Sequence, residues 1–109
     1  MDYFIENSDP DKLNFQMDLY WVVRAGANPL AYFERHPGRF HAWHVKDMNA
    51  RQRFAPVGTG SIDFKRILEQ SDRSSIKTYS VEQDATFDGQ QAMEAVQISR
   101  TALGEIGFE

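Results

Sequence analysis

The residues Phe40-His41-Ala42-Trp43-His44-Val45 indicate the fold class, because they form a strand-like run that carries a potential metal ligand near its end. The run at 13–18 ends in Asp18, and the run at 76–82 ends in Glu82, so the same arrangement occurs three times. Segments that are predicted to be helical separate the three runs. The order strand, helix, strand, helix, strand, helix predicts parallel strands joined by right-handed crossovers.

Three helical segments are predicted between and after the strands, at 29–36, 62–72 and 88–104. Asn28 is the expected N-cap of the first helix, because Pro29 suits a first helical turn. Asp88 and Gln91 have the spacing of a capping box at the start of the third helix. The buried stripe expected on that helix consists of Ala92, Val96, Ser99, Leu103 and Ile106. The remaining segments are predicted to be the end of a helix (1–7), a loop or short helical turn (20–27) and a long polar loop (46–60).

The predicted fold class is α/β, but three parallel strands do not make a complete fold of this kind. They leave two open sheet edges and half-covered faces. A closed barrel of alternating strands and helices needs eight strands and roughly 250 residues, whereas this chain has 109. The sequence is therefore expected to be part of a larger barrel.

Composition excludes several classes of protein. The chain carries 41% hydrophobic residues, which is enough for a core, and its net charge of −4 without a basic run argues against a nucleic-acid partner. It has no cysteine, which removes disulfides and thiolate metal sites. No apolar run approaches the roughly 18 residues of a membrane span, and no signal peptide is visible at the N-terminus. The expected location is the cytoplasm, with no membrane partner.

Three residues are the candidate metal ligands: Asp18, His44 and Glu82. Parallel strands point their carboxyl ends to one face, so a carboxylate, an imidazole and a second carboxylate should converge there. Oxygen, nitrogen and oxygen ligands suit Mn²⁺, Mg²⁺, Co²⁺ or Zn²⁺. Taken singly, each residue also has an explanation that involves no metal. Asp18 could be an N-cap, His44 a core or loop histidine, and Glu82 a surface carboxylate.

Further candidates lie on the loops after the strands. Trp21 is placed to stack on a sugar, and Lys46 and Arg51 could bind substrate hydroxyls, carboxylate or phosphate. Trp43 neighbours His44 and should therefore point the other way, into the core. The Gly58-Thr59-Gly60 segment is interpreted as a tight turn into the second helix in preference to a phosphate loop.

An ordered series of short motifs resembles one family. The series is Met17-Asp18-Leu19-Tyr20-Trp21, Ala25-Gly26-Ala27-Asn28-Pro29, Gly38-Arg39-Phe40, His44-Val45-Lys46-Asp47-Met48, Val57-Gly58-Thr59-Gly60-Ser61-Ile62-Asp63-Phe64 and Val81-Glu82-Gln83-Asp84. It is similar to the C-terminal part of sugar phosphate isomerase/epimerase proteins, which are xylose-isomerase-like TIM barrels. The resemblance extends from about Asn7 to Leu103.

The resemblance implies that residues 1–109 form strands six to eight of a (β/α)8 barrel with their helices. It also implies that Asp18, His44 and Glu82 are three of four metal ligands, and that Glu82 is one of two acid/base carboxylates that move a proton alpha to a sugar carbonyl. The fourth ligand, a glutamate of the fourth strand, would lie upstream of Met1. Some epimerases have a histidine where this chain has Trp21, and Arg51 is the candidate for their substrate-binding arginine.

The predicted function is therefore that of a C-terminal fragment of a metal-dependent sugar or sugar phosphate isomerase or epimerase, inactive by itself. One alternative is a non-catalytic partial barrel that binds a sugar or self-associates into a homo-oligomer through its open edges. A barrel related to nucleases that cut DNA at abasic sites is the other alternative, and the net charge of −4 argues against it.

Overall fold

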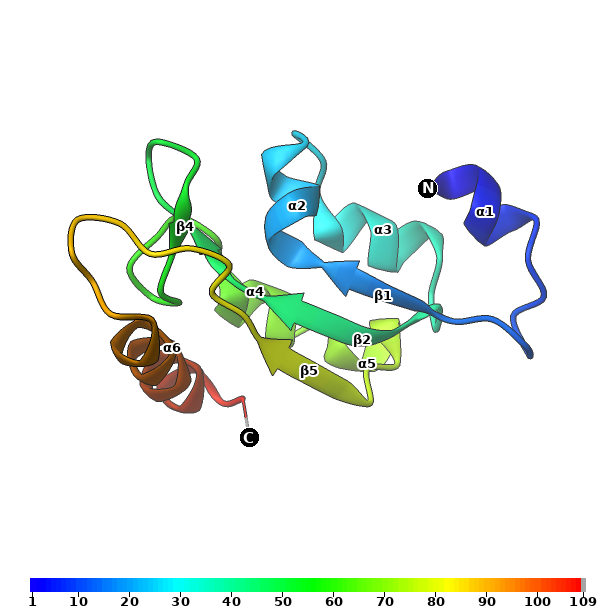
Figure 1. The fold of residues 1–109 in the computed structure, drawn as a ribbon. Helices are drawn as coiled ribbons and strands as arrows, with labels where there is room; N and C mark the ends of the chain where they lie inside the picture. Colours follow the sequence, from blue (N-terminus) through cyan, green and yellow to red (C-terminus); the bar gives the residue numbers. More distant parts are fainter. Residues whose placement is uncertain (109) are drawn as a thin grey trace.

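A three-stranded parallel sheet forms the centre of the protein in a computed structural model that describes residues 1–108 (Figure 1). The strands are β1 (Phe15–Asp18), β2 (Phe40–Val45) and β5 (Thr78–Val81). Their order in the sheet is β1-β2-β5, and both pairs are parallel. The predicted α/β class and parallel strands are confirmed.

One helix precedes the sheet, and helices follow each of its three strands. Their bounds are α1 (Asp2–Glu6), α2 (Leu19–Arg24), α3 (Pro29–Arg35), α4 (Phe64–Leu68), α5 (Ser71–Ser74) and α6 (Ala92–Ile106). The short-helix option for 20–27 is confirmed by α2. The predicted cap of α3 is also present, because the Asn28 side chain accepts a hydrogen bond from the Leu30 N–H at 3.0 Å.

Two predicted helices differ from the structure. The segment at 62–72 is divided into α4 and α5, which are separated by Glu69 and Gln70. The third helix begins at Ala92, not at 88, because Asp88 has a φ of 58° and cannot belong to a right-handed helix. Gln91 is the N-cap and makes no side-chain capping bond, so the predicted capping box was wrong.

The predicted loop at 46–60 contains a small antiparallel ladder. Strands β3 (Asp47–Met48) and β4 (Phe54–Ala55) pair there, beyond the end of β2. The hairpin contacts α2, since both the Tyr20 hydroxyl and the Arg24 guanidinium donate hydrogen bonds to the Gln52 carbonyl. The hairpin was not predicted from the sequence because two-residue strands are too short to show an alternating pattern.

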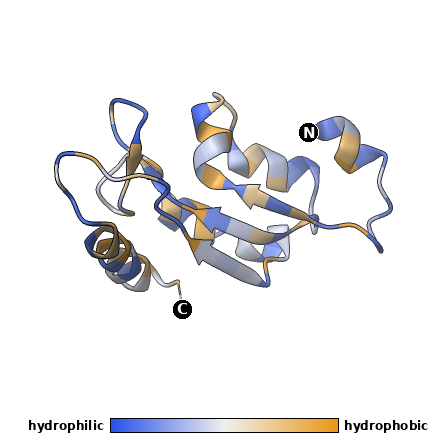
Figure 2. Ribbon diagram, in the orientation of Figure 1, coloured by the Kyte–Doolittle hydropathy of each residue, from blue (hydrophilic) through white to orange (hydrophobic). Residues whose placement is uncertain are grey.

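The core lies between the sheet and its helices. Trp43 is fully buried as predicted, and its ring stacks on Phe33 at 5.3 Å. Hydrophobic and hydrophilic bands alternate along α6 (Figure 2), and its buried residues are Ala95, Ser99 and Leu103. Ala92 is exposed, so the expected stripe is correct only towards the C-terminal end of the helix.

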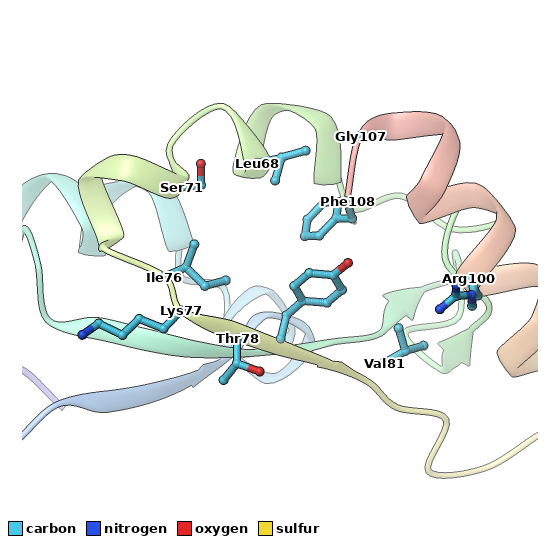
Figure 3. Close-up of a pocket in the computed structure, with 10 residues that line it drawn as sticks. Leu68, Ser71, Ile76, Lys77, Thr78, Val81, Arg100, Gly107 and Phe108 are labelled. Atoms are coloured by element: carbon cyan, nitrogen blue, oxygen red, sulfur yellow. The ribbon is translucent and has the colours of Figure 1, made fainter.

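Each outer strand keeps one edge without a partner strand among residues 1–108. A pocket of about 570 Å³ lies beside β5, and its wall includes Leu68, Thr78 and Phe108 (Figure 3). A second pocket of about 320 Å³ lies along β1, where Met1, Met17 and Trp21 contribute to the lining. Within residues 1–108, no helix combines the length and the apolar character needed to cross a membrane.

Candidate metal centre

The three predicted ligands lie at the same end of the sheet. Asp18 is the last residue of β1 and is the register partner of His44 on β2. Glu82 directly follows β5, and its N–H bonds to the Val45 carbonyl at 3.0 Å. Because all three strands run in one direction (Figure 1), their carboxyl ends deliver these side chains to one place.

The side chains are close enough to share one ion. Asp18, His44 and Glu82 each offer one ligand atom, and these atoms lie within 4.8 Å of one another. His44 Nδ1 is 3.1 Å from Glu82 Oε2 and 3.7 Å from Asp18 Oδ2. All three side chains are partly buried. Two carboxylates and one imidazole fit a divalent cation of the Mn²⁺, Mg²⁺, Co²⁺ or Zn²⁺ type, and three protein ligands leave positions for water or substrate.

The carboxylate of Asp18 has two roles, one for each oxygen. Oδ1 accepts a hydrogen bond from the Trp21 N–H at 3.0 Å and caps α2. Oδ2 faces His44 and Lys46. Asp18 is therefore the N-cap of α2, and the same capping bond fixes the rotamer that aims Oδ2 into the cluster.

Lys46 lies inside the cluster. Its Nζ is 2.9 Å from Asp18 Oδ2, 2.7 Å from Glu82 Oε2 and 2.7 Å from Asp84 Oδ2, and only 2% of the residue is exposed. Burial lowers the pKa of Lys46, but hydrogen bonds to Asp84, Glu82 and Asp18 outweigh it and hold that pKa well above its ordinary value. The ammonium is therefore a permanent positive charge among three carboxylates.

Two residues that contact Lys46 or a candidate ligand were not predicted from the sequence. Asp84 was interpreted as a turn residue, yet it pairs with Lys46. Gln16 was not considered, and its side-chain amide contacts His44 Nε2. The available signal was spacing, because Gln16 lies two residues before Asp18 on β1 and alternate strand residues share a face.

A fully buried carboxylate outside the cluster, Asp47, organises the loop after β2. Its Oδ2 accepts the N–H groups of Gly58 and Gly60 at 3.1 and 2.9 Å. Its Oδ1 accepts those of Met48 and Ile62 at 2.7 and 3.0 Å. The N–H groups of Gly58 and Gly60 thus bind the Asp47 carboxylate, in line with the interpretation of this segment as a turn in preference to a phosphate loop.

The other predicted substrate residues lie near the cluster or on the adjacent hairpin. Trp21 is 50% exposed on α2, and its ring lies 5.9 Å from that of Phe54. Arg51 is exposed on the turn between β3 and β4. Their roles in substrate binding, and that of Lys46, stay predictions.

Solved structures are similar to this chain in sequence and fold. Two are described as crystal structures of a sugar phosphate isomerase/epimerase from Parabacteroides distasonis ATCC 8503. The first has 31% sequence identity and a TM-score of 0.85, and the second has 30% identity and a TM-score of 0.83. The chain is similar to sugar phosphate isomerase/epimerases.

The similarity to these isomerase/epimerase structures covers 98% of this chain and 36% of each of theirs. The chain therefore spans about a third of their length, in agreement with the resemblance to part of a barrel inferred from the motifs. No family model and no curated protein matches the sequence.

Proposed function

We propose that the chain supplies the C-terminal three strand–helix units of a metal-dependent sugar phosphate isomerase/epimerase. The observation that carries the proposal is the convergence of Asp18, His44 and Glu82 at the carboxyl end of a parallel sheet. Similarity in sequence and structure to two isomerase/epimerases supports it.

In this proposal Asp18, His44 and Glu82 hold a divalent cation, and a bound cation would polarise the sugar carbonyl and its neighbouring hydroxyl. Glu82 takes up or returns the proton alpha to that carbonyl. The second acid/base carboxylate is expected upstream of this chain, so 1–109 alone should not complete the reaction. Trp21 is half exposed beside the cluster and would stack on the sugar.

Metal binding tests the centre directly. We expect Mn²⁺ to bind the protein in calorimetric titration and binding to be lost or strongly weakened in His44→Ala. His41→Ala is the matched control, because His41 lies on the same strand but its ring contacts the Gly38 carbonyl at 3.1 Å. Equal affinity in wild type and His44→Ala would remove His44 from the site and contradict the proposal.

Proton exchange tests the reaction. A chain that binds Mn²⁺ but does not catalyse exchange of deuterium from solvent into free or phosphorylated ketoses agrees with the fragment interpretation. Efficient turnover by 1–109 alone would show that no upstream carboxylate is required.

A non-catalytic role is the second candidate, and the open edges of β1 and β5 favour it. In that case the chain would bind a sugar or a second copy of itself without metal-dependent exchange. Sugar binding that is unchanged by a chelator would support this role over the catalytic one.

A further inference from the structure

The feature that points beyond the proposed function is the position of the Lys46 ammonium. It contacts three carboxylates at 2.7 to 2.9 Å, and the residue is almost completely buried. A lysine that bound substrate would be expected to direct its charge outward. Lys46 instead directs its charge at the chain's own acidic side chains.

Two of the three contacts involve atoms that a cation would need. Asp18 Oδ2 and Glu82 Oε2 bond to Lys46 Nζ, and the same two oxygens lie nearest to His44 Nδ1. An ammonium and a divalent cation cannot both have full use of these oxygens, because the oxygens have limited acceptor capacity and the two positive charges repel each other.

The third contact is different. Asp84 is not part of the group of candidate ligands, and its side chain is 42% exposed. It pairs with Lys46 Nζ at 2.7 Å. If the ammonium withdraws from Asp18 and Glu82, Asp84 can retain it, so Asp84 gives the lysine a partner that does not obstruct a bound cation.

We propose that Lys46 is an internal competitor for the metal centre and that Asp84 is the carboxylate that holds its ammonium when a divalent cation binds. This inference rests on the proposed metal site. It assigns Lys46 a role in setting the affinity for the cation, in place of direct contact with the substrate.

A double-mutant cycle with Mn²⁺ as the probe tests the inference by calorimetry at constant pH and ionic strength. Lys46→Met should bind Mn²⁺ roughly tenfold more tightly than wild type, as expected if the cation-accepting arrangement is about a tenth populated. Asp84→Asn should bind it several-fold more weakly, because the lysine then loses its alternative partner. Lys77→Gln is the charge-matched control, since Lys77 lies at the opposite end of β5, and its affinity should stay close to that of wild type.

The double mutant separates competition from a simple change of charge. If Asp84 acts through Lys46, Asp84→Asn should change the affinity little in the Lys46→Met background, so the two effects are not additive. Additive effects, or an affinity of Lys46→Met equal to or weaker than wild type, would overturn the inference while leaving the metal site intact. Absence of Mn²⁺ binding in every variant would instead refute the proposed metal site. Asp84→Asn keeps Lys46 and changes an exposed side chain, so it remains informative if Lys46→Met does not fold.

Discussion

At the scale of single residues, the structure uses buried charge in two ways. Asp47 satisfies four backbone N–H groups of the loop after β2, and Lys46, next to it in sequence, neutralises carboxylates of the candidate centre. The convergence of Asp18, His44 and Glu82 could be predicted, because strand direction alone determines it. The contacts of Asp47 and Asp84 could not, because they depend on side-chain rotamers and loop geometry, whereas the spacing of Gln16 from Asp18 was a signal that was not used.

Substitution of Asp47 by asparagine should destabilise the protein strongly. The asparagine side chain would present an N–H₂ group to two of the four backbone N–H donors, and the buried loop would lose charge-assisted hydrogen bonds. We expect a loss of about 2–4 kcal/mol in the free energy of unfolding, measured by denaturant titration.

Asp11→Asn, at an exposed turn position, is the control and should change the free energy of unfolding little. A stability of Asp47→Asn equal to that of wild type would show that the carboxylate does not hold the loop. Gly60 has a related constraint, since a Cβ there would lie 2.3 Å from Asp47 Oδ1.

At the scale of elements, the strands could be predicted more reliably than the last two helical segments. The three strands are short runs bounded by turns with apolar residues at alternate positions, as at Phe15 and Met17 or Tyr79 and Val81, and this alternation is a direct signal for them. The segment at 62–72 has apolar residues at helical spacing, but the helix stops at Leu68 and restarts at Ser71. The left-handed conformation of Asp88 delays α6, and the turn signal of the Asp88-Gly89 dipeptide was passed over in favour of the capping-box spacing.

The attachment of α6 to the loop after β4 depends on a buried serine. Ser99 Oγ donates to the Ala95 carbonyl at 3.0 Å and accepts the N–H of Val57, which is fully buried, at 2.9 Å. Ser99→Ala would leave that N–H without its acceptor. We expect a loss of about 1–2 kcal/mol after the small gain in helix propensity. Thr101→Ala, at an exposed position of the same helix, should be near neutral when both are measured by thermal unfolding.

The attachment of α1 should depend on pH. The hydrogen bond from His36 is the main cause that lowers the pKa of Asp2 from its ordinary value of 3.8; burial opposes it, and the charge of Arg35 adds a smaller lowering effect. A lowered carboxylate pKa gives stability that is complete above the ordinary value and is lost as the pH falls through the lowered one.

Thermal unfolding of Asp2→Asn tests this pH dependence. The variant should unfold at a lower temperature than wild type near pH 6, and the difference should disappear in strongly acidic solution. A difference that stayed constant between these pH values would show that the Asp2 carboxylate does not act through its charge.

At the scale of the whole molecule, the main feature is a parallel sheet of three strands. The incompleteness of the barrel could be predicted, because three strands cannot close a ring that needs eight. Similarity to about a third of two isomerase/epimerase structures agrees with it. The strand edges that lack a partner strand within residues 1–108 and the pockets beside β1 and β5 are features that favour association.

Self-association should therefore increase with protein concentration. We expect sedimentation velocity to show dimers or larger species at high concentration, and Thr78→Lys to shift the distribution towards monomer, because a charge on an edge strand opposes pairing with another chain. Thr78 is exposed on β5. Asn7→Lys, an exposed position outside the sheet, adds the same charge and should leave the distribution unchanged. A monomer at all concentrations would contradict this prediction.

The contrasting environments of the two tryptophans make the chain its own optical reporter. Trp43 is fully buried and stacks on Phe33 in the core. Trp21 is 50% exposed to solvent, and its backbone N–H bonds to Asp18. Emission from Trp43 should lie at shorter wavelength and resist collisional quenchers, and emission from Trp21 should lie at longer wavelength and be quenched readily. One fluorescence spectrum can therefore follow the integrity of the core and events at the candidate centre separately, without an added label.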